Sequence, residues 1–92
     1  MTQSGFEAAF ASGARAYYDG LTAADRAEID EIREAIETNP YPDGQLKRPV
    51  DLPNIIVYQD ARWAVLYEIA EPGHIQIGDI ARAGQPRWWF PR

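Results

Sequence analysis

The sequence predicts one α+β domain, in which an N-terminal helical hairpin packs on a small antiparallel β-sheet. Helical periodicity dominates residues 13–38, whereas residues 54–82 contain three segments that alternate as β-strands do. The chain has 92 residues, which is the size of one small domain. We therefore treat residues 1–92 as a single unit.

The clearest element is a helix predicted over residues 23–38. Thr22 is a favourable N-cap, and Asp25, three residues later, completes a Thr-x-x-acid capping pattern at the positive end of the helix dipole. The residue before Pro40 disfavours the α conformation, which ends the helix. Isoleucines recur with helical spacing and predict one buried stripe: Ile29, Ile32 and Ile36.

A shorter helix is predicted over residues 13–19, with Ser12 as its N-cap and Gly20 as its terminator. The start of the chain is ambiguous. Residues 4–7, Ser-Gly-Phe-Glu, could be a capping box that opens a longer helix. The alternation of Phe6, Ala8 and Phe10 instead favours a short strand, which is the preferred interpretation.

Residues 40–53 are rich in proline and are interpreted as a connecting loop. Three strands are predicted after it, over residues 54–59, 62–70 and 74–82. In the third strand the isoleucine alternation changes phase at Gly78, which predicts a β-bulge. In the second strand one face is apolar: Trp63, Val65, Tyr67 and Ile69.

Two helices can cover only one face of such a sheet, so the other face is expected to be partly open and to bind a partner. By strand parity Arg62 and Glu68 share a face. If the apolar face of their strand packs on the helices, Arg62 points to the open side.

Composition excludes several classes of function. The chain has no cysteine and one histidine, so a disulfide framework or a transition-metal site is not expected, and we expect no cofactor. The histidine, His74, is interpreted as a solvated turn residue. No apolar run is long enough to span a membrane, and no secretory signal is visible, which indicates a cytoplasmic protein.

Net charge is −5, but it is unevenly distributed. Residues 1–44 have nine acids and three bases, whereas residues 45–92 have five acids and six bases. Most of the acids lie on the helix predicted over residues 23–38, where they are interpreted as a solvated face. The second half therefore carries the residues that could meet a polyanion.

A basic and aromatic set is the remaining candidate for chemistry. RNA can be cleaved without a metal when its 2′-hydroxyl attacks the adjacent phosphate, provided that cations stabilise the charge on the phosphorane. Aromatic side chains can hold the bases by stacking. The candidate catalytic residues are Arg48, Arg62 and Arg82. The candidate substrate-binding residues are Lys47, Arg87, Trp88 and Trp89, with Tyr58 as a further stacking candidate.

Several segments together resemble the RelE/ParE superfamily of bacterial toxins. They include residues 9–21, 25–36 and 62–69, the Ile75–Arg82 strand, and Asn39-Pro40 with Asp43-Gly44; Val65-Leu-Tyr-Glu-Ile69 is the most specific. The order of the elements also fits. The short first helix and the lack of a C-terminal His-x-Arg-Arg-Asp-like string favour the RelE branch.

The resemblance implies the toxin of a type II toxin–antitoxin pair. In the RelE branch this is a ribosome-dependent mRNA endonuclease, with Arg48, Arg62 and Arg82 on the phosphate and Lys47 assisting. The alternatives are a non-catalytic, ParE-type inhibitor of DNA gyrase and a member that acts only as an interaction domain. The expected partners are a cognate antitoxin, bound through an amphipathic helix or an added strand, and the ribosome with its mRNA.

Overall fold

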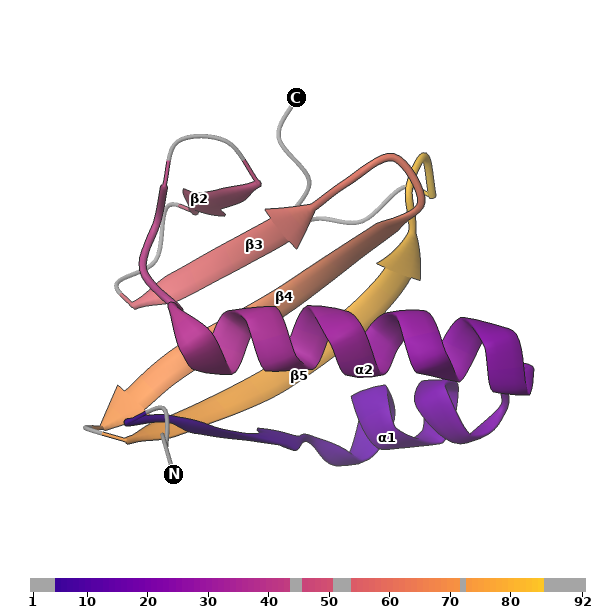
Figure 1. Ribbon diagram of the computed structural model, residues 1–92, viewed down its shortest axis with the longest axis horizontal. Helices are drawn as coiled ribbons and strands as arrows, with labels where there is room; N and C mark the ends of the chain where they lie inside the picture. The colour runs from indigo at the N-terminus through magenta and orange to yellow at the C-terminus, as the bar shows by residue number, and fades with distance from the viewer. Residues whose placement is uncertain (1–4, 44–45, 51–53, 72, 86–92) are drawn as a thin grey trace.

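The computed structural model describes residues 5–43, 46–50, 54–71 and 73–85. Two helices pack on a five-stranded sheet (Figure 1), which confirms the predicted α+β class. The elements in chain order are β1 (Glu7–Phe10), α1 (Ser12–Asp19), α2 (Ala23–Thr38), β2 (Lys47–Pro49), β3 (Ile55–Gln59), β4 (Trp63–Glu71) and β5 (His74–Arg82). Within the described residues, no helix is long and apolar enough to cross a membrane.

The sheet has the strand order β1-β5-β4-β3-β2 and is mixed, whereas an antiparallel sheet was predicted. Strands β2 to β5 pair antiparallel, but β1 runs parallel to β5. Parallel neighbours need a long crossover connection, and the chain between β1 and β5 supplies it. The start of the chain is therefore a strand, as the alternation of residues 6–10 favoured.

Both helices were predicted nearly to the residue. Helix α2 has the predicted bounds, and the hydroxyl of its N-cap Thr22 accepts a hydrogen bond of 3.1 Å from the amide of Asp25. Helix α1 begins one residue earlier than predicted, at Ser12, and its N-cap Ala11 makes no side-chain capping bond. The isoleucine stripe of α2 is buried as predicted: Ile29, Ile32 and Ile36.

Strand β2 was missed, because residues 40–53 were interpreted as a loop. It is three residues long and ends at a proline, so the local signal favoured a turn. Its pairing with β3 is what makes it a strand, and Lys47 lies opposite Tyr58.

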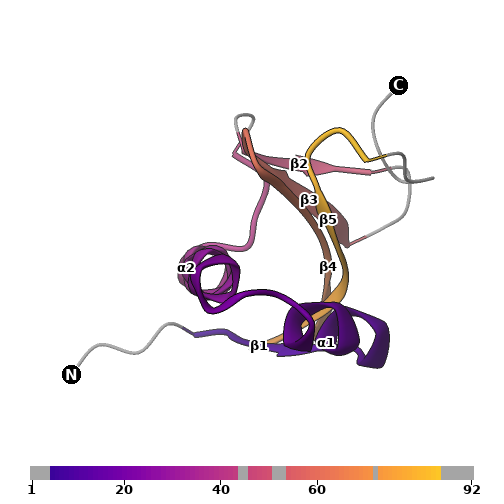
Figure 2. The ribbon, with the colours of Figure 1, turned by 90° about the vertical axis from the view of Figure 1, so that its right-hand side faces the viewer.

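The main core lies between the helices and the concave side of the curved sheet (Figure 2), where α2 crosses β4 and β5 (Figure 1). Trp63, Val65 and Tyr67 of β4 are buried there, as their alternation predicted. The predicted bulge is also present, because the β4–β5 register shifts by one residue at Gly78. The bulge keeps Ile77 and Ile80 on the same face of the sheet.

On the second face of the sheet, the described residues differ in exposure between the two ends. Glu68 and Gln76 are exposed at one end. At the other end Val57, Ala64 and Ala81 are at most 1% exposed and form a small second cluster. The expected open face is therefore shorter than strand parity implied.

Candidate functional site

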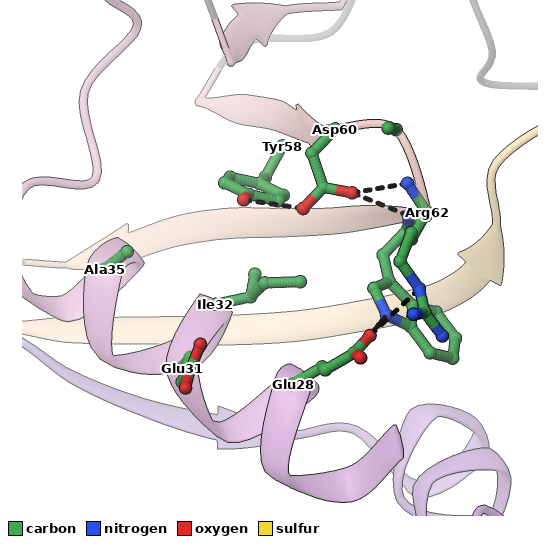
Figure 3. A pocket seen from close by; sticks show the side chains of 9 residues that line it. Glu28, Glu31, Ile32, Ala35, Tyr58, Asp60 and Arg62 are labelled. Atoms are coloured by element: carbon green, nitrogen blue, oxygen red, sulfur yellow. Dashed lines mark hydrogen bonds and ion pairs between the residues drawn. The ribbon is translucent and has the colours of Figure 1, made fainter. Parts of the chain in front are cut away.

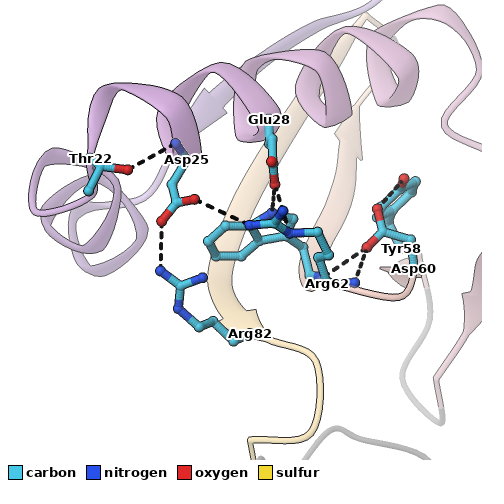
Figure 4. A network of polar contacts seen from close by, with 8 residues as sticks. Thr22, Asp25, Glu28, Tyr58, Asp60, Arg62 and Arg82 are labelled. Atoms are coloured by element: carbon cyan, nitrogen blue, oxygen red, sulfur yellow. Dashed lines mark hydrogen bonds and ion pairs between the residues drawn. The ribbon is translucent and has the colours of Figure 1, made fainter.

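Two of the predicted catalytic arginines meet at the N-terminal end of α2 (Figure 4). The Nη2 atom of Arg82 lies 2.7 Å from one carboxylate oxygen of Asp25. The Nη2 atom of Arg62 lies 3.5 Å from the other oxygen. One carboxylate thus bridges two guanidinium groups, one from the turn before β4 and one from the end of β5.

The orientation of Arg62 corrects the prediction that it points to the open side of the sheet. The backbone amides of Arg62 and Trp63 each donate a 2.8 Å hydrogen bond to Asp60, which turns the chain tightly into β4. The side chain of Arg62 then extends to α2, where its Nε atom lies 3.2 Å from Glu28. It therefore lies on the helix side.

Arg82 reaches the same cluster from the end of β5. It lies opposite Trp63 in the β4–β5 register, and its guanidinium stands 4.6 Å from the centroid of the indole ring. This is the geometry of a cation–π contact. The indole is itself fixed, because its Nε1 atom donates a 2.6 Å hydrogen bond to Glu28.

The electrostatics of this cluster are balanced. The hydrogen bond from Arg82, with the charges of both arginines, lowers the pKa of Asp25 below its ordinary value. The same contact raises the pKa of Arg82. Two arginines face two carboxylates, those of Asp25 and Glu28, so the formal charges cancel. Both acids had been assigned to a solvated helix face, and their i, i+3 spacing at the start of α2 was the available signal that they act together.

The other two basic candidates lie elsewhere. Arg48 is opposite Val57 on the second face of the sheet, and its Nη2 atom donates a 3.1 Å hydrogen bond to Gln59. Lys47 is 8% exposed, and its Nζ atom lies 3.9 Å from Asp43. The structure therefore does not bring Arg48 together with Arg62 and Arg82. Three further candidates lie outside the described residues: Arg87, Trp88 and Trp89.

A cavity of about 560 Å³ opens beside the cluster, between α2 and the turn that joins β3 to β4 (Figure 3). Carboxylates and aromatic rings line it. The hydroxyl of Tyr58 donates a 2.8 Å hydrogen bond to Asp60 at its rim. Burial, followed by this bond to an acid, raises the pKa of Tyr58 to about 12.

Solved structures share this architecture. No protein-family model and no curated protein matches the sequence. A chain of the toxin–antitoxin complex RelBE2 from Mycobacterium tuberculosis superposes with a TM-score of 0.70 at 16% identity, over 85% of this chain and 98% of that one. The isolated E. coli RelE toxin superposes with a TM-score of 0.64 at 14% identity, over 90% and 88%. The chain has a RelE-like fold.

In this RelE-like domain the arginine cluster can hold an anion, and the proton-transfer candidates beside it among the described residues are the carboxylates of Asp25 and Glu28 and the hydroxyl of Tyr58. His74 and Arg82 lie at opposite ends of β5, about 25 Å apart at the rise of a β-strand. The raised pKa of the Tyr58 hydroxyl makes it a weak acid. Among the described residues no group of His, Asp or Glu is placed to hold a metal ion.

Proposed function

We propose that the protein is the toxin of a type II toxin–antitoxin pair and that it acts in the cytoplasm. The convergence of Arg62 and Arg82 on one carboxylate, within a RelE-like fold, carries this proposal. One structural neighbour is a toxin–antitoxin complex, which supports an antitoxin as the partner of this chain.

The proposed activity is cleavage of mRNA on the ribosome. Arg62 and Arg82 would hold the scissile phosphate, because two guanidinium groups can neutralise the charge that develops on a phosphorane. The attacking group would be the 2′-hydroxyl of the RNA itself, so no metal is required. Contributions from Arg48 and Lys47, and from the tail residues Arg87, Trp88 and Trp89, remain predictions.

A second candidate is a non-catalytic toxin that blocks a protein target such as DNA gyrase. Two observations favour it. The arginines are neutralised by Asp25 and Glu28, and Arg48 lies on the other face of the sheet. A domain that only binds other proteins would need neither a cationic site nor a proton-transfer group. A member that has lost toxicity is the third alternative.

Expression in a bacterium separates these candidates. We would induce the protein, follow growth, and map mRNA 5′ ends by primer extension. Growth arrest with codon-phased cuts supports the nuclease, and arrest with lost DNA supercoiling but no cuts supports gyrase inhibition. Normal growth at good expression refutes the toxin proposal.

Single variants then test the site. Arg62→Ala and Arg82→Ala should abolish the cuts. Arg48→Ala tests whether the third arginine predicted to be catalytic is needed for cleavage. Arg15→Ala is the matched control, because Arg15 is exposed on α1 and pairs only with its neighbour Asp19 among the described residues. Cuts that persist in both Arg62→Ala and Arg82→Ala would exclude these residues as the phosphate site.

A further inference from the structure

We propose that Asp25 is an internal competitor for the anion site formed by Arg62 and Arg82. An oxyanion such as an RNA phosphodiester would bind there by displacing this carboxylate. The inference takes its ligand class from the proposed function, but it concerns regulation of the site and has its own test.

The geometry resembles an occupied oxyanion site. Asp25 directs one oxygen to each arginine, at 2.7 and 3.5 Å. A phosphodiester also presents two non-bridging oxygens, and arginine pairs with phosphate and carboxylate groups in the same way. The side chain of Asp25 is 14% exposed, whereas those of Arg62 and Arg82 are 59% and 46% exposed. The arginines are therefore accessible to a ligand, and the competing carboxylate lies between α2 and their guanidinium groups (Figure 4).

The local structure holds Asp25 in place without trapping it. Its amide is bonded to the hydroxyl of Thr22, and its position in the first turn of α2 favours a negative charge. The Thr22 bond fixes the backbone of Asp25, whereas the helix dipole and Thr22 only favour the ionised carboxylate. A rotation of the Asp25 side chain about χ1 would therefore remove the carboxylate from the site. Release of the site requires no unfolding of the helix.

The charges indicate how strongly Asp25 competes. With Asp25 and Glu28 in place, the four ionic groups sum to zero, and a bound phosphodiester would make the cluster net negative. Without the charge of Asp25, the same complex would be neutral. Glu28 stays engaged in either case, because it also accepts the hydrogen bond from Trp63.

Binding of an uncleavable RNA tests the proposal. The probe is a fluorescein-labelled 2′-O-methyl oligouridine, which lacks the free 2′-hydroxyl, and the readout is fluorescence anisotropy. Asp25→Asn should bind it about fivefold more tightly than the wild-type protein at low salt. The slope of log K against log salt should also steepen, by up to about 0.7, because the wild-type protein frees one carboxylate charge when the phosphate binds and Asp25→Asn does not.

Glu34→Gln is the matched control, because it removes one acid from an exposed position on the same helix. It should change affinity less than about twofold, since Glu34 lies about 13 Å along α2 from Asp25 and makes no ion pair with either arginine among the described residues, so its effect through water is weak. In the double variant Asp25→Asn/Arg82→Ala the gain should disappear. Equal affinities for Asp25→Asn and Glu34→Gln, or a gain that survives loss of Arg82, would overturn the proposal.

Circular dichroism shows whether Asp25→Asn is folded. If it is not folded, the wild-type protein is titrated with inorganic phosphate and followed by NMR instead. The Nε–Hε signal of Arg82 and the carboxyl carbon signal of Asp25 must shift with one midpoint, and their failure to do so overturns the proposal. Tighter binding without growth arrest or mRNA cuts would refute the proposed function alone, and cuts without tighter binding would refute only this inference.

Discussion

Replacement of Tyr67 by phenylalanine should destabilise the fold measurably. Tyr67 lies at the centre of β4 and is 1% exposed. Its hydroxyl donates a buried 2.6 Å hydrogen bond to the carbonyl of Pro40. Pro40 is also buried and follows α2, so this bond ties the end of the helix to the middle of the sheet.

The expected magnitude follows from this burial. A buried hydrogen bond contributes about 1 kcal/mol, and an acceptor left without its partner away from water adds a desolvation penalty. We expect Tyr67→Phe to lower the free energy of unfolding by about 1.5 kcal/mol. For a domain of this size such a loss corresponds to a fall in Tm of about 6–12 °C.

Urea titration followed by circular dichroism is the assay. The midpoint should fall with no change in the m-value, because the fold and its buried surface stay the same. Tyr17→Phe is the control, since the Tyr17 hydroxyl forms no hydrogen bond within the described part of the chain and its ring packs against the same core. A loss for Tyr67→Phe no larger than that for Tyr17→Phe would refute the role assigned to the bond with Pro40.

Four further predictions concern stability. Gly73 has φ +83°, and an added Cβ would lie 3.1 Å from the carbonyl of Gly5, so Gly73→Ala should cost about 1 kcal/mol or more in urea titration. Gly84→Ala, at φ +91° with open space around it, should cost less. Thr22→Ala removes the N-cap bond and should lower the free energy of unfolding by about 1 kcal/mol. Burial raises the pKa of both Tyr58, to about 12, and Tyr67 above the ordinary value of 10. The contribution of the two neutral tyrosines to the free energy of unfolding is complete below pH 10 and is lost as pH rises towards their folded-state pKa values. The urea midpoint should therefore fall between about pH 10 and 12. This fall should be smaller in Tyr58→Phe than in the wild-type protein.

The features that the sequence predicted correctly are those set by short-range pattern. Thr22 and Pro40 delimit α2, and the alternation from Trp63 onwards assigns the face of β4 that is buried. The phase change at Gly78 was sufficient to locate the bulge. Each of these signals lies within a few residues of the structure that it specifies.

The features that were missed depend on contacts between distant segments. Strand β2 exists because it pairs with β3, and the parallel pairing of β1 depends on β5, which lies far along the chain. Arg82 and Asp25 are separated by 57 positions. Strand parity failed for Arg62 because this residue precedes β4, and the Asp60 turn and a long side chain direct it to Glu28.

The two edges of the sheet bear on how a partner would bind. At one edge the outward amide of Ala8 donates a 2.8 Å hydrogen bond to Glu37. At the other edge the amide and carbonyl of Lys47 are both bonded to Asp43, at 3.0 and 3.1 Å, and Pro49 has no amide hydrogen to donate. An added strand would have to break these bonds before it formed its own. Of the two binding modes left open by the sequence, we therefore expect the proposed antitoxin to use a helix on a face of the domain, which leaves both edges intact.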